Sequence, residues 1–353
     1  MIKILFLLLL LPAFLIAQPN RNYKNLVMEG GGVRGLAYPG ALQVLEEQGI
    51  LDSIHNVAGS SAGAIAGIMV ALNYSSHEID SVLHSIKIQE FNDGRFFIGK
   101  IKRVTKEYGI YKGVKLSDWI GNIIQYKTGH ADITFKDLHE LHLKDPGFKN
   151  FYCTGTNISK QELEIFSWEN WPDMKLKTAV HISSCIPFYF VPIAIDNRGN
   201  EVAIEQDSIK YDLYVDGGML CNYPISIFDS CKNGGNPLVC NDIVFNPQTL
   251  GLKLERGAQI EAFEQNKTDL APYRIENMKD YSSAVMNLLV ETVNRRSPEL
   301  KNEKERTIYI SYGNISGKPR KVSITEKMEL YNNGVSAANK FFKINSSTVR
   351  SGN

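Results

Sequence analysis

The chain has 353 residues, of which 43% are hydrophobic and 22% charged, and its formal net charge is +1 at pH 7. This composition is typical of a globular protein with a sizeable core. Acidic and basic residues are nearly matched and interleaved, which argues against nucleic-acid binding.

The N-terminal segment has the pattern of a secretory signal peptide. Lys3 is followed by an apolar run from Ile4 to Ala17, and the polar segment Gln18–Asn22 comes next. The run is shorter than the ~20 residues that a membrane-spanning helix needs, which favours a cleaved signal over an anchor. We therefore expect residues 1–17 to be removed and the chain to be exported, to the periplasm, the cell envelope or the medium.

Two strand–turn–helix units follow one another after this segment. Tyr23–Met28 is predicted to be a buried strand that leads through a glycine-rich turn into a helix from about Leu36 to Gln48. Ile54–Ala58 is predicted to be a second strand, followed by a Gly–Ser turn and a helix from Ala62 to Leu72. Successive units of this kind predict a parallel sheet with helical crossovers.

The later part of the chain continues this alternation. Further strands are predicted at Phe151–Asn157, Glu162–Phe166, Leu213–Val215, Asp242–Phe245 and Thr307–Tyr312. Further helices are predicted within residues 74–142, with a capped start at Thr134–Leu141, from Glu261 to about Asn294, and over Thr325–Phe342 with Thr325 as its cap. The charged stretch Glu299–Arg306 is predicted to be a solvated turn or face. We expect one domain over residues 22–258 and an extension over residues 259–353 that packs on it.

The cysteines do not indicate a metal or redox motif, because no C-x-x-C pair occurs. The five are Cys153, Cys185, Cys221, Cys231 and Cys240. Export would permit disulfides, and Cys231 with Cys240 is the simplest local pairing. Buried free thiols are the alternative.

A serine between small residues is the most informative site. Gly59-Ser60-Ser61-Ala62-Gly63 lies where a strand is predicted to turn into a helix, which is the context of a nucleophile elbow. Gly59 and Gly63 leave room for the sharp turn, and Ser61 would be exposed near a helix N-terminus that favours developing negative charge. Taken alone, the pattern also fits a plain glycine-rich turn.

The glycine-rich segment after the first strand allows two interpretations. It comprises Gly30, Gly31, Gly32, Val33, Arg34 and Gly35, and it matches G-x-G-x-x-G. A dinucleotide site would need an acidic residue closing the second strand, whereas Asp52 precedes that strand. Backbone N–H groups of such a loop can instead form an oxyanion hole, which the neighbouring Ser61 favours. Arg34 would orient these amides or attract an anionic substrate, and a surface charge is the alternative.

An aspartate supplies the candidate base. Asp216 ends a predicted strand and is followed by Gly217 and Gly218, which predicts a tight turn at the sheet edge. The seven histidines are His55, His77, His84, His130, His139, His142 and His181, and none follows Asp216. The Ser–acid–His order of α/β-hydrolases would need an acid before His181 in place of Asp216, and a Ser61–Asp216 dyad is simpler.

No cofactor or metal is predicted. His139-Glu140-Leu141-His142 is not the H-E-x-x-H zinc signature and is predicted to be a surface pair, and no EF-hand loop occurs.

Four ordered blocks resemble the patatin-like phospholipase family. They are Glu29–Gly35 with Tyr38–Gly40, Gly59–Gly63, Ser183–Pro187 followed by Val191-Pro192, and Asp216–Gly218 with Asn222–Pro224. The resemblance covers about residues 24–256. It implies an α/β, three-layer fold in which a central, mostly parallel sheet is flanked by helices, here with a C-terminal helical extension.

The resemblance also implies lipid acyl hydrolysis without a metal, with Ser61 as nucleophile, Asp216 as base and the amides around Gly31 and Gly32 as oxyanion hole. His181 and Cys185 stand where arginine and alanine are more common in the family, which bears on packing near the pocket. The implied partner is a lipid or phospholipid at a membrane or micelle surface, and the oligomeric state is left open.

Three alternatives remain at this point. A carboxylesterase acting on small soluble esters would share the mechanism. A non-catalytic lipid-binding protein would keep the fold without turnover. A nucleotide-binding oxidoreductase would use the glycine loop but would leave Ser61 and Asp216 without a role.

Overall fold

The computed structural model describes residues 22–94, 103–204, 210–240, 242–265, 267, 269–294 and 300–343. The predicted signal peptide, residues 1–17, lies outside these ranges, so export stays a prediction. Within the described ranges, no helix combines the length and the apolar character that crossing a membrane requires.

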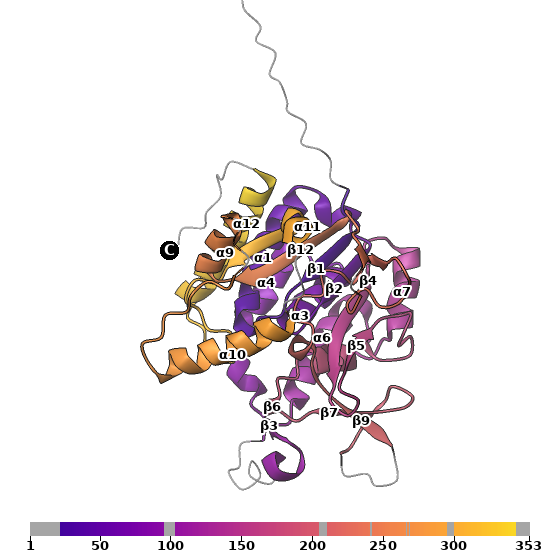
Figure 1. The fold of residues 1–353 in the computed structure, drawn as a ribbon. Coiled ribbons are helices and arrows are strands. Elements are labelled where there is room, and N and C mark those ends of the chain that lie inside the picture. Colours follow the sequence, from indigo (N-terminus) through magenta and orange to yellow (C-terminus); the bar gives the residue numbers. More distant parts are fainter. Residues whose placement is uncertain are drawn as a thin grey trace, which may run out of the picture.

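A mixed sheet of nine strands, counted over the described residues, forms the centre of the molecule (Figure 1). Its parallel part consists, in spatial order, of β13 (Thr307–Ser311), β12 (Thr249–Glu255), β1 (Asn25–Met28), β2 (Asn56–Gly59) and β4 (Asn150–Asn157). The antiparallel strands are β9 (Tyr211–Asp216), β7 (Ile193–Asp196), β8 (Glu201–Val202) and β5 (Glu162–Phe166). Two short sheets pair β3 (Gly109–Tyr111) with β6 (Phe188–Phe190) and β10 (Ser230–Cys231) with β11 (Ile243–Val244).

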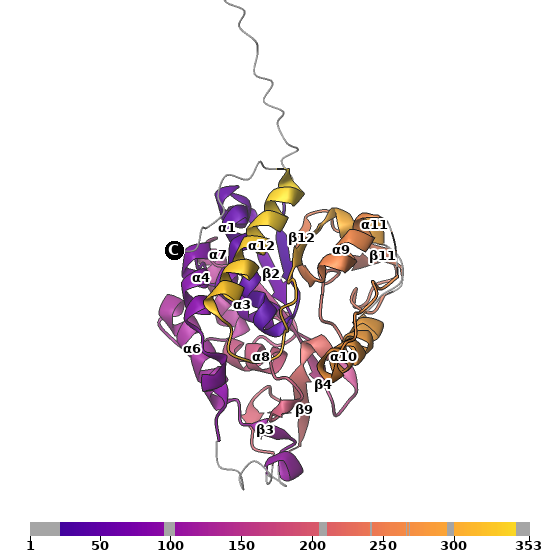
Figure 2. The same cartoon turned by 90° about the vertical axis from the view of Figure 1, so that its left-hand side faces the viewer.

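Helices cover both sides of this sheet. The first half contributes η1 (Gly32–Ala37), α1 (Tyr38–Glu47), α2 (Ile50–Ser53), α3 (Ala62–Ala71), α4 (Ser76–Ser85), η2 (Ile88–Phe91), α6 (Val114–Thr128), α7 (Phe135–Lys144) and α8 (Leu176–Ser183). The second half contributes η3 (Gly217–Met219), α9 (Gly257–Glu264), α10 (Met278–Asn294), α11 (Leu300–Glu305) and α12 (Ile324–Phe342). Figure 2 shows α1, α4 and α6 on one side of the strands and α9 and α11 on the other. The expected α/β fold is therefore confirmed.

The period of two along each strand divides the core between the two faces of the sheet. Leu26 pairs in register with Val57 and belongs to the large core cluster, which also includes residues of α1, α3 and α12. Val27 pairs with Ala58, and these two pack against Ile225 in a smaller cluster on the opposite face. Both strands are thus buried on both faces, as near-continuous apolar runs in parallel sheets usually are.

The C-terminal extension contributes to the same sheet. β13 pairs with β12 in parallel, and α12 packs on α1 and η1. The division of the chain at residue 258 stays a prediction.

The cap of α12 was wrongly predicted: Ser323 and Glu326 form a capping box, so Thr325 lies inside the helix. The capped start at Thr134 is confirmed, with Asp137 as its partner.

Two other predicted elements differ from the structure, and one strand was missed. Glu261–Asn294 is not one helix, because residues 265–277 separate α9 from α10 and include Pro272, which a helix interior does not tolerate. Asp242–Phe245 contributes only the short β11, outside the main sheet. The strand that does enter the sheet in this region, β12, was not predicted.

The cysteines divide into a pair and three single residues. Cys231 and Cys240 form a disulfide, while Cys153, Cys185 and Cys221 are free and buried.

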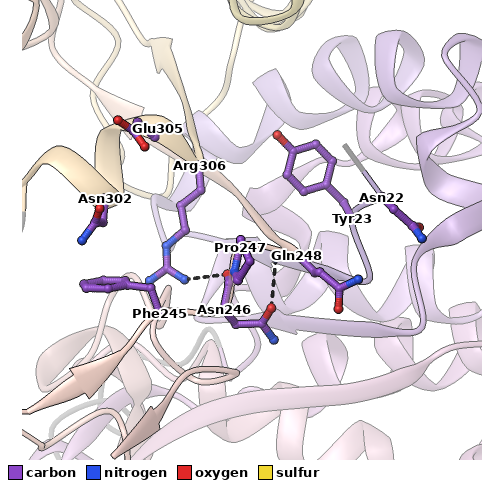
Figure 3. A pocket seen from close by; sticks show the side chains of 9 residues that line it. All are labelled: Asn22, Tyr23, Phe245, Asn246, Pro247, Gln248, Asn302, Glu305 and Arg306. Carbon is purple, nitrogen blue, oxygen red and sulfur yellow. Dashed lines mark hydrogen bonds between the residues drawn. The ribbon is translucent and has the colours of Figure 1, made fainter. Parts of the chain in front are cut away.

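The charged stretch Glu299–Arg306 also differs from expectation. Its described part forms α11, and Arg306 after it is buried and donates two hydrogen bonds of 2.6 Å to Asp229. Arg306 lines a cavity of about 460 Å³ at the amino ends of β1, β12 and β13 (Figure 3). This edge is opposite the carboxyl ends of the parallel strands, so the cavity lies away from Ser61.

We expect Arg306→Met to lower the free energy of unfolding by about 3–5 kcal/mol, because it leaves the Asp229 carboxylate buried without a partner. Urea denaturation measures this change. The double variant Arg306→Met/Asp229→Leu should recover most of the loss, since an apolar pair replaces the ion pair. A single variant within about 0.5 kcal/mol of the wild type would contradict the role of this pair.

Candidate active site

Ser61 occupies a strained turn between β2 and α3. Its backbone has φ +50° and ψ −120°, in a region that residues with a side chain rarely adopt. β2 ends at Gly59, and four residues later, at Gly63, the chain passes close to the end of β1. A Cβ atom on Gly63 would collide with the carbonyl oxygen of Met28, so only glycine fits there. The predicted strand–turn–helix context of Ser61 is confirmed.

Asp216 reaches Ser61 because β9 runs antiparallel to its neighbour β4. Asp216, the last residue of β9, pairs with Gly155, and Cys153 two residues earlier pairs with Gly59 at the end of β2. The Ser61 hydroxyl donates a hydrogen bond of 2.6 Å to Oδ2 of Asp216. The two residues are 8% and 7% exposed, so this contact is largely shielded from water.

Hydrogen bonds fix the aspartate in this position. Its Oδ1 accepts from the N–H of Gly218 at 2.7 Å, and its own N–H donates to the carbonyl of Cys185 at 2.9 Å. The hydroxyl of Thr156 donates to its carbonyl oxygen at 2.9 Å. Burial raises the pKa of Asp216 to about 6, against the lowering effect of the hydrogen bonds from Ser61 and Gly218.

The glycine-rich loop lies directly against Ser61. A Cβ atom on Gly30 would be 3.0 Å from the Cβ of Ser61, so the loop can approach this closely only without a side chain. Gly32 has φ +57°, which glycine adopts without strain, and it starts η1. Gly35 follows in η1 and lies against Ala62, which starts α3.

The backbone N–H groups of this loop differ in whether they already have a hydrogen-bond partner. Those of Gly30, Val33 and Arg34 donate to the carbonyls of Asn222, Gly317 and Gly31, respectively. Across the described part of the chain, the N–H groups of Gly31 and Gly32 have no such partner. Of the six predicted oxyanion-hole residues, these two therefore offer uncommitted backbone donors.

Side chains that the sequence analysis did not assign hold these parts together. The N–H of Ser61 donates to the hydroxyl of Ser183 at 3.0 Å. The side-chain amide of Asn222 donates to the carbonyl of Gly30 at 3.1 Å. The side-chain amide of Asn294, at the end of α10, donates to the carbonyl of Gly218 at 3.2 Å, and its Oδ1 accepts from the N–H of Asn222.

Buried Glu29 helps to hold the glycine-rich loop in place. Its carboxylate accepts from the N–H of Leu254 at 2.8 Å and from the side chain of Asn222 at 3.3 Å. Burial raises the pKa of Glu29 well above its ordinary range, with Lys253 as the main opposing charge. Ser183 and Asn222 lie in sequence blocks that were recognised, whereas nothing in the sequence near Asn294 marked it.

A largely apolar cavity of about 110 Å³ opens beside Ser61. Its lining consists of Gly32, Val33, Gly35, Leu36, Ser61, Ala62, Ile65, Leu83, Ile86, Ile88, Phe91, Leu116, Ser184, Ile186, Phe190 and Pro319. Ser61 is thus placed between the apolar lining and the carboxylate of Asp216, so a bound apolar chain would have its polar end at the serine.

Arg34 does not act as a free surface charge. Its Nε donates to the carbonyl of Ile315 at 2.9 Å, and its guanidinium lies 3.6 Å from the ring centroid of Tyr312. It therefore holds the segment before α12 against the glycine-rich loop. This contact is structural, so neither an amide-orienting nor an anion-attracting role is needed to explain the residue.

The histidines stay apart from the serine and the aspartate, since none of them hydrogen-bonds either side chain. His181 is buried beside Gly113 with both ring nitrogens unpartnered among the described residues, and burial lowers its pKa to about 4. His139 and His142 are half-buried, so the expected surface pair was wrong: His139 stacks on Trp168. The described side chains include no cluster of three or more metal-ligating residues.

Comparisons with known proteins found related sequences. A family model described as "Patatin-like phospholipase" matches residues 26–229. The "Probable lipid hydrolase 463L" of Invertebrate iridescent virus 6 is 28% identical over 217 residues, which cover 61% of this chain and 67% of the relative. "Uncharacterized protein R571" of Acanthamoeba polyphaga mimivirus is 31% identical over 207 residues, which cover 58% of this chain and 61% of the relative.

The fold has a counterpart among solved structures. The crystal structure of VipD from Legionella pneumophila superposes with a TM-score of 0.56 at 18% sequence identity and covers 91% of this chain and 67% of VipD. At this identity the likeness concerns the fold alone.

Proposed function

This chain belongs to the patatin-like phospholipase family, and on that premise we propose that it is a serine acyl hydrolase. Its proposed substrates are acyl esters of lipids. The observation that carries the proposal is the 2.6 Å hydrogen bond from Ser61 to Asp216 at a strained turn beside an apolar cavity. Ser61 acts as the nucleophile and Asp216 as the base.

The proposed reaction has two steps, acylation of Ser61 and hydrolysis of the acyl-serine. The Ser61 oxygen attacks the ester carbonyl while Asp216 accepts the hydroxyl proton, and the tetrahedral intermediate places its negative charge on the former carbonyl oxygen. The carbon–oxygen bond to the alcohol then breaks, and the leaving alcohol takes the proton from Asp216. Water, deprotonated by the same carboxylate, hydrolyses the acyl-serine and releases the fatty acid.

The glycine-rich loop stabilises the intermediate. The amides of Gly31 and Gly32, which have no partner among the described residues, serve as oxyanion donors. One well-placed donor of this kind is worth about 3 kcal/mol of transition-state stabilisation. The amide of Ser61 donates to Ser183 and so helps to fix the elbow.

Burial makes Asp216 a better base than an exposed aspartate. Its pKa of about 6 brings it closer to neutral pH, while the carboxylate is still mostly ionised above that value. The apolar lining of the cavity indicates that the acyl part of the substrate is a hydrocarbon chain, which supports a lipid ester.

Acyl release from a fluorogenic phospholipid tests this function, with a short-chain soluble ester run in parallel. We expect hydrolysis of the phospholipid, unchanged by EDTA, because none of the proposed steps involves a metal. Turnover of the short-chain ester alone would indicate a soluble-ester carboxylesterase. No turnover of either compound, together with binding of the phospholipid, would indicate a lipid-binding protein.

A further inference from the structure

Helix α10 carries an apolar face that the described chain leaves largely exposed. Its large exposed apolar side chains, together with one just before it, lie between 39% and 77% exposed: Ile275, Met278, Tyr281, Val285, Leu288, Leu289 and Val293. They recur at helical spacing, so they form one stripe along the helix. We call these seven residues the α10 stripe.

Two acidic side chains of α10 have partners outside the α10 stripe. Asp280 accepts hydrogen bonds from the side chain of Asn277 at 2.8 Å and from the N–H of Glu276, at the start of the helix. Glu291 is half-buried and raises the pKa of buried Glu29, so it lies on the side of the protein body. A surface helix ordinarily has the reverse arrangement, with its apolar side inward and its charges in water.

The position of α10 connects this stripe to the candidate active site. Asn294, the last residue of the helix, hydrogen-bonds Gly218 and Asn222, which hold the turn of Asp216 and the glycine-rich loop. η3 contacts α10, and its Met219, three residues from Asp216, is itself exposed. Figure 1 shows α10 (orange) below β12 and β1, with one end projecting beyond the sheet.

We propose that the α10 stripe is the surface by which this protein docks on a lipid aggregate. The proposal rests on the proposed function, because a lipid hydrolase must meet its substrate at an interface. The stripe is uncharged, and its helix contacts η3, which carries the exposed Met219 three residues from Asp216. A lipid surface satisfies both features, since an amphipathic helix lies in such an interface with its apolar face buried.

The test measures binding separately from turnover. Every protein carries Ser61→Ala, so that vesicles stay intact, and the full chain is used, so that any contribution of residues 4–17 is the same in all variants. Leu288→Asn/Leu289→Asn, at 56% and 57% exposure, is compared with Leu143→Asn/Val239→Asn, which replaces two more exposed apolar residues (71% and 63%) in α7 and in the turn before Cys240. Flotation with phosphatidylcholine vesicles gives the affinity, and circular dichroism with thermal melting verifies that each variant folds.

We expect the α10 pair to weaken vesicle binding at least tenfold and the control pair to change it less than twofold. In proteins with Ser61 restored, the ratio of vesicle to short-chain ester hydrolysis should fall by a similar factor for the α10 pair. Equal binding by the two pairs would overturn the proposal. So would a concentration-dependent dimer that only the α10 pair dissociates, with vesicle binding unaffected, since the stripe would then contact a second copy. If the α10 pair weakens vesicle binding but the protein with Ser61 restored hydrolyses no ester, the proposed function is refuted and the docking surface is retained.

Discussion

Replacing Ser61 by alanine is expected to lower kcat/KM for phospholipid by about ten-thousandfold or more, because it removes the atom that forms the acyl intermediate. The substitution deletes one oxygen from a position that is 8% exposed and leaves the backbone of the turn unchanged. Initial rates of acyl release, measured at saturating and limiting substrate, give the change. A fluorophosphonate probe should label the wild-type protein at Ser61 and leave the variant unlabelled.

The neighbouring serine supplies the matched control. Ser60 is fully buried, and its hydroxyl has no hydrogen-bond partner among the described residues. We expect Ser60→Ala to retain activity within about threefold of the wild type, because the removed hydroxyl makes no hydrogen bond with the described residues. More than a hundredth of the wild-type rate in Ser61→Ala would show that another residue is the nucleophile.

Replacing Asp216 by asparagine is expected to lower kcat at least about a thousandfold, because an amide of nearly the same shape cannot accept the proton of Ser61. The hydrogen bond to Gly218 can persist through the side-chain oxygen, so the turn should stay in place. Stopped-flow or steady-state assays across a pH range measure the loss. We expect the reduction to be constant above pH 6, with none regained at high pH, and to become smaller below pH 6, where the wild-type enzyme loses its ionised base and the variant has none to lose.

The pH dependence of the wild-type enzyme follows from the same group. Asp216 must be ionised to act as a base, and burial raises its pKa to about 6. We therefore expect kcat/KM to decrease as the pH falls through about 6, instead of near the ~4 of an exposed aspartate. An acidic limb at the ordinary carboxylate value would contradict the desolvated site.

Asp216→Asn should also make the protein more stable at alkaline pH. A carboxyl group whose pKa is raised in the folded state favours folding when protonated, and that contribution is lost as the pH rises through about 6. An increase of about two pH units corresponds to about 3 kcal/mol. The variant should thus gain up to about 3 kcal/mol at pH 8 and nothing below pH ~4, as measured by urea denaturation. A decrease in stability at pH 8 would indicate that Asp216 is mainly structural.

The sequence by itself predicted the features that local chemistry determines. Small residues around Ser61 predicted a turn that larger side chains cannot enter, and the collision of a Cβ atom on Gly63 with Met28 is the physical reason. Thr134 predicted a capped helix start, and the structure completes the capping box with Asp137 three residues on, which local sequence alone can supply. The apolar run Tyr23–Met28 likewise predicted a buried strand, and β1 spans Asn25–Met28.

Local pattern failed where the environment of a residue is supplied by distant segments. β12 was not predicted, although Leu250, Leu252 and Leu254 alternate along it as in a strand, and the contacts of its Gly251 and Lys253 come from distant segments. The side chain of Tyr223 fills the space beside Gly251, and Lys253 is paired with Glu303 at 3.2 Å. Arg306 appeared to belong to a solvated charged stretch, yet Asp229, 77 residues away in the chain, makes its burial possible.

The candidate site also combines features that local sequence predicts with features that only the tertiary structure decides. Ser61, the glycine-rich loop and Asp216 were recognisable as separate motifs, since each depends on a tight turn at the end of a strand. Their assembly depends on β9 returning antiparallel to β4, which brings together two side chains 155 residues apart. The raised pKa of Asp216, the support from Ser183 and Asn294, and the outward apolar face of α10 were decided only by the tertiary structure, because burial and long-range contacts exist only once the sheet has formed.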